Sequence, residues 1–490
     1  MPSSLEKYFA PFRKNVIGAN QTFQTPYGKK KIIYADWTAS GRLYSPIENT
    51  LAKKFGPFVG NTHTEVTVTG TAMTRAYHEA QQIIKRHVGA GPNDVIIEAG
   101  SGMTGAVCAF QRILGLRFPE RLSKFTKIPA SARPIVFITH MEHHSNQTSW
   151  FETICDVEII PPTRNGLVDS ENLKPLLKKY QNRKIKIAAV SAGSNVTGIQ
   201  PPIHAITKLM HQNGGLCFVD YACAAPYVEI NMHPKNRAES LDAIYFSPHK
   251  FLGGPGSPGI LIFDSKLYQN RVPDCPGGGT VLWTNPWGGR HYFENIESRE
   301  DGGTPPFLGT IKTALAIRLK EKMGVKNILA REKEILAQLF PTMKKIPNLH
   351  ILAGEHEHRL GVISFNIEGQ HYNLVSKLLN DRFGIQTRGG CACAGTYGHH
   401  LFHIDKKISK KITNQLNRGD YSSKPGFVRL SINPIMSNQE ILFIIRALKE
   451  VAAKGQIWAK DYKYNSHTNE FTHKKFKNKT EQSLINSFDL

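Results

Sequence analysis

The sequence predicts an α/β protein in which a larger domain, built on a mainly parallel sheet, is followed by a smaller α+β domain. Through the first two-thirds of the 490 residues, short and almost continuously apolar runs alternate with segments of helical periodicity. Such runs are typical of strands buried on both faces, as in parallel sheets covered by helices. Beyond residue 307 helices and strands follow in mixed order, and a chain of this length rarely folds around a single core.

The larger domain has five apolar runs that we predict to be strands: residues 94–99, 134–139, 186–192, 215–220 and 241–247. Residues 73–88 carry apolar side chains at three- and four-residue spacing, which predicts an amphipathic helix. Glycine and proline then dominate residues 271–306, which predicts a long functional loop or a crossing between domains.

The smaller domain is predicted to contain helices near residues 308–324, 327–340 and 372–383 and strands at residues 361–367 and 427–432. Its last helix begins with Ser437 and Glu440, the pattern of a capping box. The predicted organisation is an N-terminal arm at residues 1–30, the larger domain at 31–307, the smaller domain at 308–462 with a basic insertion at 397–426, and a polar tail at 463–490.

The composition is globular and basic, since 40% of the residues are hydrophobic and the net charge is +23. The positive charge is mostly dispersed and no nucleic-acid-binding motif is present, so a nucleic-acid partner is not expected. No apolar run approaches the roughly 18 residues of a membrane helix, and the first residues lack the apolar stretch of a secretory signal. The seven scattered cysteines argue against a disulfide framework, so we expect a cytoplasmic protein that does not bind membranes.

A glycine-rich loop, Gly100-Ser-Gly-Met-Thr-Gly105, lies between the strand at 94–99 and a helix. Its backbone amides and the helix dipole are suited to a phosphate group. The same pattern fits the dinucleotide fingerprint, which also needs an acid at the end of the next strand. Glu120 has that spacing but lies in no predicted strand, so the loop predicts a phosphate site rather than a dinucleotide site.

Further polar residues follow the predicted strands at the edge where α/β folds bind ligands. Lys250 ends the segment Ser-Pro-His-Lys, Asp220 ends the strand at 215–220, and His143 and His144 follow the strand at 134–139. A desolvated lysine can form a Schiff base, a carboxylate can keep a pyridinium protonated, and an imidazole can stack on a flat ring and move a proton. Taken singly, these residues have simpler interpretations: a surface lysine, a helix cap, and a solvated or metal-binding pair of histidines.

Taken together and in this order, the motifs make the chain resemble the class V aminotransferase-fold enzymes of the cysteine desulfurase and selenocysteine lyase branch. The resemblance covers about residues 34–453. It rests on the motifs YADWTASG, GNTH, MEHHSN, SNVTG, VDYACA, SPHK, EDGGTP and FVRLS. It implies a fold type I enzyme with a seven-stranded, mainly parallel sheet in its large domain, pyridoxal 5′-phosphate as the cofactor, and a homodimer.

The resemblance also implies a role for each matching residue. Lys250 would bind the cofactor covalently and act in catalysis, His143 would stack on the cofactor ring and assist proton movement, and Asp220 would hold the pyridine nitrogen. The remaining cofactor contacts that it implies are Gly102, Met103, Thr104, Asn195, Cys223, Ser247 and His249, with Gly303 and Thr304 lent by the neighbouring subunit. The implied substrate contacts are Arg429, Arg388 and Asn195. Cys223 stands where the family usually has glutamine.

The loop Arg388-Gly-Gly-Cys-Ala-Cys393 aligns with the loop that carries the family's persulfide cysteine, and Cys393 matches that cysteine. A thiol in a glycine-rich, positively charged loop can have a lowered pKa, and the thiolate is the nucleophile. Other interpretations are a small buried cysteine, a structural pair with Cys391, or a metal site with His399, His400 and His403. The metal site fits no common zinc spacing, so no metal is predicted. The 35 residues between Cys393 and Arg429 are more than we expect for the family, so the basic insertion is a candidate to cover the active site or dock a partner.

The resemblance thus implies a cysteine desulfurase, which removes sulfur from L-cysteine to give L-alanine through a persulfide on Cys393, with a sulfur-acceptor protein as a candidate partner. The alternative is another class V enzyme (an aminotransferase, an epimerase or another lyase) that acts on a different amino acid and in which Cys393 is a bystander. A third interpretation is a relative without catalytic activity that binds RNA or another acidic partner through the insertion.

Overall fold

The structure, a computed structural model, describes residues 3–125, 127–477 and 480–489. The chain forms two compact units. Unit 1 comprises Met1–Ala39, Asn195–Ile199 and Lys326–Leu490, and unit 2 comprises Ser40–Ser194 and Gln200–Val325. The sequence predicts domains that are continuous along the chain, whereas each unit combines separate segments. The reason is that the N-terminal residues and the short segment Asn195–Ile199 pack with the C-terminal part of the chain.

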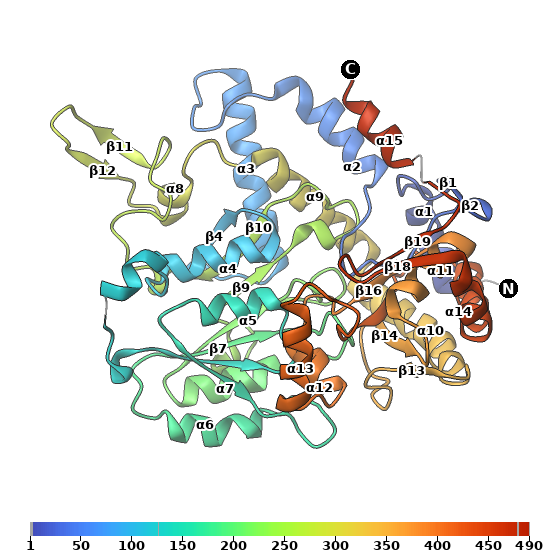
Figure 1. Cartoon of the computed structure of the whole chain (residues 1–490). Helices are drawn as coiled ribbons and strands as arrows, with labels where there is room; N and C mark the ends of the chain where they lie inside the picture. The colour runs from blue at the N-terminus through green and yellow to red at the C-terminus, as the bar shows by residue number, and fades with distance from the viewer. Residues whose placement is uncertain (1–2, 126, 478–479, 490) are drawn as a thin grey trace. The chain divides into compact units, whose positions relative to one another are not determined.

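Unit 2 is built on a seven-stranded sheet with the strand order β4-β10-β9-β8-β7-β5-β6 (Figure 1). The strands are β4 (Asp94–Ala99), β5 (Ile135–Thr139), β6 (Asp156–Ile160), β7 (Lys186–Ser191), β8 (Leu216–Asp220), β9 (Ala243–Phe246) and β10 (Gly259–Asp264). Within this sheet β10 pairs antiparallel with both β4 and β9, and every other pair is parallel. The predicted seven-stranded, mainly parallel sheet is therefore confirmed, although β6 and β10 were not among the predicted strands.

Helices cover both faces of this sheet, which explains why its central strands are apolar throughout. On one face, Phe110 of α4 (Gly102–Ile113) packs on Phe218 of β8 and on Phe263 of β10, with ring centroids 4.8 and 5.0 Å apart. The preceding residue of β8, Cys217, has its thiol near Thr207 of α7 (Ile203–Gln212) on the other face. The predicted helix at 73–88 is part of α3 (Val68–His87), which packs along α9 (Phe307–Met323).

Residues 271–306 are more ordered than the glycine and proline content indicated. They contain a hairpin of β11 (Val281–Thr284) and β12 (Arg290–Tyr292), followed by the short helix α8 (Ile296–Glu300). The tip of the hairpin is a turn in which Asn285 Oδ1 accepts the N–H groups of Trp287 and Gly289. The glycines therefore shape turns between short regular elements.

Unit 1 contains a four-stranded antiparallel sheet with the order β13-β14-β17-β16. Its strands are β13 (Leu349–Ile351), β14 (Val362–Ile367), β16 (Arg388–Gly390) and β17 (Phe427–Ser431). Its long helices are α10 (Val325–Lys344), α11 (Tyr372–Phe383) and α14 (Asn438–Trp458). A parallel pair of β3 (Ile33–Tyr34) and β15 (Ile385–Gln386) joins the N-terminal segment to this unit.

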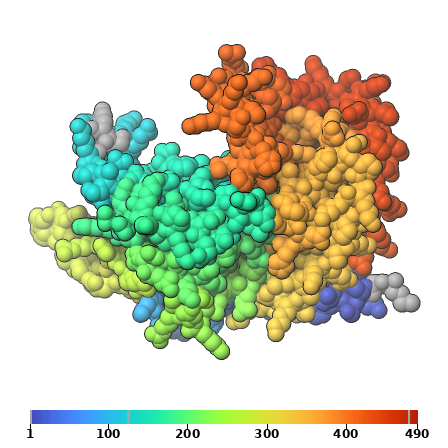
Figure 2. Space-filling model, turned by 90° about the horizontal axis from the view of Figure 1, so that it is seen from below, coloured from blue at the N-terminus to red at the C-terminus, as the bar shows by residue number. Residues whose placement is uncertain are grey.

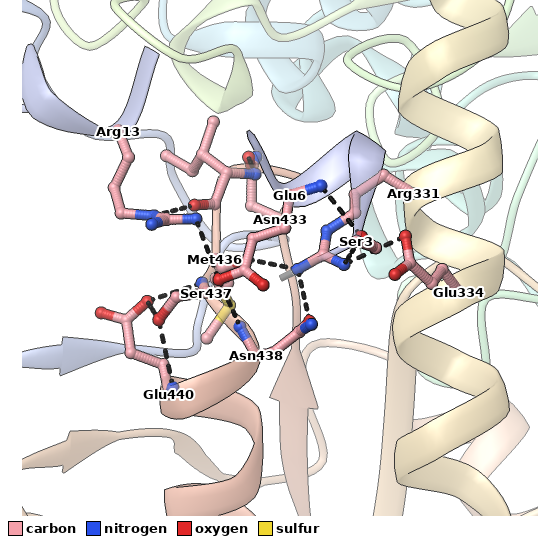
Figure 3. Close-up of polar contacts among 11 residues, drawn as sticks. Ser3, Glu6, Arg13, Arg331, Glu334, Asn433, Met436, Ser437, Asn438 and Glu440 are labelled. Atoms are coloured by element: carbon pink, nitrogen blue, oxygen red, sulfur yellow. Dashed lines mark hydrogen bonds and ion pairs between the residues drawn. The ribbon is translucent and has the colours of Figure 1, made fainter. Parts of the chain in front are cut away.

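The N-terminal helix α1 (Ser4–Lys14) is anchored to α10 and to the start of α14 by the polar contacts in Figure 3. Arg331 of α10 is fully buried, and its guanidinium donates to Met436 O (2.9 Å) and Asn438 Oδ1 (2.8 Å). Glu6 of α1 accepts the N–H of Asn438. The predicted capping box of Ser437 and Glu440 is confirmed. These contacts explain why the N-terminal residues belong to unit 1, since a buried arginine requires partners.

Part of the predicted polar tail is folded. Strands β18 (Tyr462–Asn465) and β19 (Glu470–His473) form a hairpin. Its turn residue Asn469 accepts a hydrogen bond from Asn373 and donates one to the Tyr372 hydroxyl, both on α11. Across the described ranges, no helix combines the length and apolarity that a membrane crossing requires.

Candidate active site

The predicted site residues divide between the two units. Unit 2 holds the glycine-rich loop and the strand-end residues, whereas unit 1 holds Asn195, Arg388, Cys393 and Arg429. We describe the two groups in turn and name them the strand-end site and the cysteine turn.

The glycine-rich loop begins the strand-end site at the N-terminus of α4. Ser247 Oγ accepts the N–H of Met103 at 2.8 Å, which ties the loop to the end of β9. Gly102 has φ +60°, and a Cβ there would lie 2.7 Å from Ser247 Oγ and 3.4 Å from His249 Nε2. Only glycine therefore allows this close approach. Thr104 Oγ1 is exposed and lies 2.7 Å from Ser145 Oγ. The cradle combines helix amides, hydroxyls and an imidazole, and this donor set suits a phosphate.

Asp220 ends β8 as a buried carboxyl, and its Oδ1 accepts the N–H of Ala222 at 2.7 Å. Burial raises the pKa of Asp220 to about 7, while the Ala222 hydrogen bond and the charge of Lys250 oppose this rise. Burial and the same lysine charge lower the pKa of His249 to about 4, so His249 is neutral at pH 7. A buried acid of this kind favours a cationic partner such as a protonated pyridine nitrogen.

Lys250 closes the short 3₁₀ helix Pro248–Lys250 that follows β9, and its N–H bonds to Ser247 O. The charge of Lys250 acts on both Asp220 and His249, which places its ammonium group in their neighbourhood. The lysine is partly buried. Its place after a central parallel strand is where α/β folds bind their ligands.

His143 is the N-cap of α5 (His144–Phe151), and its Nδ1 accepts the N–H of Ser145 at 3.1 Å. Because Nδ1 accepts, the neutral ring carries its proton on Nε2. Helix capping therefore fixes the orientation and the tautomer of this histidine.

The neighbouring Glu142 was not predicted from the sequence. This buried carboxylate accepts hydrogen bonds from the Ser191 hydroxyl (2.5 Å), from Asn146 Nδ2 (2.7 Å) and from the Thr139 hydroxyl. Asn146 in turn accepts the hydroxyl of Tyr245 on β9 at 2.6 Å. This network joins the ends of β5 and β7 to α5 and holds the strand-end site together. Its only signal in the sequence is its place in the polar motif MEHHSN, shortly after the apolar strand β5.

Cys223, Gly303 and Thr304 also belong to unit 2. Cys223 is buried, and its thiol lies 3.6 Å from Ser194 O. The exposed Thr304 hydroxyl donates to Asn61 Oδ1 at 3.3 Å, and His63 Nε2 donates to Gly303 O at 3.1 Å. The segment that contains Gly303 and Thr304 is therefore held by the GNTH stretch of the same unit.

Beside this segment lies a polar cavity of about 680 Å³, lined among others by His63, Tyr77 and Asp301. The Tyr77 hydroxyl lies 3.0 Å from Glu98 Oε2 and 3.3 Å from Asp301 Oδ1. Burial raises the pKa of Glu98 to about 7 and that of Asp301 to about 6. These two carboxyls therefore retain protons more readily than exposed acids do.

The cysteine turn spans Cys391–Ala394 directly after β16. The Ala394 N–H bonds to Cys391 O at 3.0 Å, and the two central residues, Ala392 and Cys393, have φ +48° and +56°. These values are those of a type I′ turn, which normally uses glycine or asparagine. The left-handed region costs a side-chain-bearing residue roughly 1–2 kcal/mol. Asn195 Nδ2 donates to Ala392 O at 2.7 Å within the buried interior and thereby stabilises the turn.

Arg429 lies on β17 with only 3% of its side chain exposed, and it links to the same asparagine. Its Nη1 donates to the backbone oxygen of Asn195 at 3.2 Å, and its Nη2 bonds to Asp36 Oδ1 at 2.6 Å. Within the described part of the chain, its buried Nε has no hydrogen-bond partner. Arg388 faces Arg429 in the β16–β17 ladder and is exposed. An unsatisfied guanidinium N–H beside a second arginine suits a carboxylate.

Among the described residues, no group of three or more His, Cys, Asp or Glu is arranged to hold a metal ion. His399 links two helices instead, since its Nδ1 donates to Gly395 O at 2.8 Å and its Nε2 accepts from Ser409 Oγ at 3.0 Å. All seven cysteines are free thiols.

The mainly parallel sheet carries a phosphate cradle, a buried acid and a lysine at its strand ends. This combination is typical of one class of protein, the fold type I enzymes that use pyridoxal phosphate. A comparison with models of known protein families identifies the family within this class. The model of the family "Aminotransferase class-V" matches residues 33–443, and the chain belongs to this family.

Proteins of similar sequence share the name probable cysteine desulfurase. A protein of Staphylococcus aureus named probable cysteine desulfurase is 27% identical over 369 residues, which cover 74% of this chain and 84% of that protein. A protein of the same name from Staphylococcus epidermidis is 27% identical over 387 residues, or 78% and 87% of the two chains.

Solved structures share the fold. The apo cysteine desulfurase of Thermococcus onnurineus superposes with a TM-score of 0.71 at 22% identity, over 90% of this chain and 98% of that one. The Escherichia coli cysteine desulfurase CsdA gives a TM-score of 0.67 at 18% identity, over 88% and 97%.

Proposed function

We propose that this pyridoxal-phosphate enzyme is a cysteine desulfurase that converts L-cysteine to L-alanine and leaves the sulfur on Cys393. The observation that carries the proposal is the cysteine turn. A partly exposed thiol occupies a strained position, and Asn195 connects its turn to the buried Arg429. A thiol acceptor and a carboxylate-binding group thus lie in one hydrogen-bonded array. The names of the relatives support the same reaction.

The strand-end site fits the cofactor. Gly102, Met103 and Thr104, with Ser247 and His249, would hold its phosphate, and Cys223 would lie at the position where the family usually has glutamine. Asp220 would hold its ring nitrogen, and Lys250 would attach it. When bound, the cofactor supplies an electron sink for the bond changes at the substrate α-carbon. Asn195 is a further predicted contact of the cofactor and the substrate, although its Nδ2 donates to Ala392 O.

The chain's own groups would then move protons and bind the substrate. Arg429 would bind the substrate carboxylate through its unsatisfied Nε, and the exposed Arg388 would add a second positive charge on the same strand pair. Lys250 Nζ would take the proton from the substrate α-carbon, and His143 would assist proton movement through its Nε2–H.

Sulfur transfer balances without an external oxidant. The Cys393 thiolate attacks the substrate sulfur, a sulfur–sulfur bond forms, and the carbon–sulfur bond breaks. The electron pair of that bond stays on carbon, which takes up a proton to become the alanine methyl group. The products are L-alanine and a Cys393 persulfide, so the sulfur is oxidised and the carbon is reduced.

Further features of the proposal rest on other observations. A homodimer would use the exposed Gly303 and Thr304 in the neighbouring subunit's site. A cytoplasmic location agrees with seven free thiols, since reducing compartments keep thiols unpaired.

Alanine release from L-cysteine by the cofactor-loaded protein tests the proposal. We expect Cys393→Ala to lower the rate at least about 100-fold, because the residue that receives the sulfur is lost. Cys391→Ala is the matched control and should retain the rate within about threefold, because Cys391 is not one of the two turn residues with positive φ, Ala392 and Cys393. A protein that shows the visible absorption of its bound cofactor but releases no alanine would contradict the proposal and favour another class V reaction.

A further inference from the structure

The basic insertion forms an exposed helical element in unit 1 between the cysteine turn and β17. It contains α12 (Gly395–Leu401) and α13 (Lys406–Leu416), and α13 has no buried residue. In Figure 2 this orange segment projects from the surface. Four lysines of α13 are exposed: Lys406, Lys407, Lys410 and Lys411. None of the four forms an ion pair with another described residue, so their charges face solvent.

The positions of these lysines lower the stability of α13. Asp405 is the N-cap, so Lys406 and Lys407 occupy the first two helical positions, where the helix dipole favours acids. Lys410 and Lys411 follow one turn later and repel them, since like charges four residues apart destabilise a helix. Some exposed lysines elsewhere pair with an acid, as Lys174 does with Glu171. Local stability therefore does not explain this arrangement.

The insertion also connects α13 to the cysteine turn. Helix α12 begins two residues after Cys393, and its seven residues span only about 10 Å. His399 bonds to Gly395 at the start of α12 and to Ser409 in the first half of α13. A molecule that binds α13 is therefore held within a short reach of the Cys393 thiol.

We propose that α13 is the docking surface for a protein with an acidic face and a thiol, which takes the sulfur from Cys393. This inference rests on the proposed desulfurase function. Charge complementarity selects an acidic partner. Ile408, which is 47% exposed among the lysines, adds an apolar contact that suits a protein better than a phosphate backbone.

The transfer that this docking serves is balanced. The partner thiolate attacks the outer sulfur of the Cys393 persulfide, a new sulfur–sulfur bond forms on the partner, and Cys393 leaves as a thiolate. No oxidant or reductant is required, and Cys393 is regenerated for the next substrate.

The test uses the cofactor-loaded full chain with L-cysteine and two synthetic peptides, each with one cysteine, flanked either by glutamates or by serines. We expect the glutamate peptide to accept sulfur at least about 10-fold faster at low ionic strength, with the advantage lost at high salt. Replacement of Lys406, Lys407, Lys410 and Lys411 by Gln, which retains helix propensity, should abolish the advantage. Turnover with dithiothreitol, which carries no charge, should remain unchanged.

A matched control removes the same charge elsewhere, through Lys→Gln changes at the exposed Lys53, Lys54, Lys174 and Lys178. This variant should keep the preference for the glutamate peptide. An unchanged preference in the α13 variant would overturn the proposal. So would lysine-dependent binding of a fluorescent single-stranded RNA without any effect on peptide transfer, since this would identify α13 as a nucleic-acid surface.

Binding of the labelled glutamate peptide, followed by fluorescence anisotropy, separates this proposal from the function on which it rests. Absence of alanine with dithiothreitol would refute the desulfurase function. If the α13 variant also bound the peptide as tightly as the wild type, the acidic docking surface would be refuted as well. If no alanine is released but the peptide binds the α13 variant more weakly than the wild type, the result would support an acidic partner and refute sulfur acceptance.

Discussion

The strand-end site of unit 2 and the cysteine turn of unit 1 hold their reactive groups by different means. In the strand-end site, the residues that adopt positive φ, such as Gly102, are glycines, and the buried Glu142 accepts several hydrogen bonds. In the cysteine turn, Ala392 and Cys393 take left-handed conformations without glycine, and Asn195 secures the turn with one side-chain hydrogen bond. Strain of this kind concentrates at functional sites. The comparison indicates that the proposed cofactor site uses glycine wherever the backbone is left-handed, whereas the thiol proposed to accept sulfur lies in a strained turn.

The largest effect should follow from removing Lys250, the lysine proposed to bind the cofactor, while leaving the cysteine turn intact. Lys250→Ala is expected to lower alanine release by at least about 1,000-fold, because attachment of the cofactor and removal of the α-proton are both lost. The alkylation rate of Cys393 by iodoacetamide, measured by peptide mass spectrometry, should stay within about twofold. A comparable fall in the alkylation rate would show that the two regions do not act separately.

Gly102→Ala should damage the strand-end site through its cradle. The new Cβ would lie 2.7 Å from Ser247 Oγ at a φ of +60°, so both overlap and strain oppose it. Overpacking of this kind costs about 1–3 kcal/mol, and the dissociation constant of the cofactor should rise about 10- to 100-fold. The control Gly115→Ala has φ +67° but open space around its Cβ, so it should leave the affinity unchanged in a fluorescence titration.

The strand-end site could be predicted from the sequence because its signals are local. Lys250 and Asp220 directly follow apolar strands, and the glycine-rich loop directly precedes a helix. Two strands of the seven-stranded sheet were missed for physical reasons. In the edge strand β6 only Ile160 is buried, and β10 follows a stretch rich in glycine and proline.

The cysteine turn could be predicted only in part. Its cysteines were visible, but a type I′ turn without glycine or asparagine at its centre has no sequence signature. Asn195 lies 197 residues before its partner Ala392, and Asp36 lies 393 residues before its partner Arg429, so only tertiary folding brings these residues together. The packing of Asn195–Ile199 with unit 1 is likewise a tertiary effect.

Asn195→Ala should affect the cysteine turn more than the strand-end site. Loss of the 2.7 Å bond to Ala392 O frees the turn, and sulfur transfer should fall about 10-fold because the thiol is misplaced. Asn195→Asp should behave similarly, since a carboxylate cannot donate to a carbonyl. The alkylation rate of Cys393 should change in both variants, and the cofactor affinity should not. A weaker affinity with unchanged alkylation would instead support the cofactor contact predicted from the sequence.

The smallest effect concerns the pH dependence of the cofactor-free protein. Burial raises the pKa of Asp220 to about 7 in the folded chain, from an ordinary value of 3.8. The folded chain therefore binds more protons than the unfolded chain across this window, and its stability falls as the pH rises from about 4 to 7. Asp220→Asn cannot ionise, so its Tm should exceed that of the wild type by a few degrees at pH 8 and match it near pH 4. Calorimetry that found the same difference at both pH values would contradict this assignment.

The most direct test of the account is the mass of the Cys393 peptide after the cofactor-loaded protein reacts with L-cysteine in the absence of a reductant. The account predicts that this peptide gains the mass of one sulfur atom, with one alanine released for each sulfur gained, and that Cys393→Ser prevents both. Alanine release with no sulfur on Cys393, or with the sulfur on Cys391 instead, would contradict it.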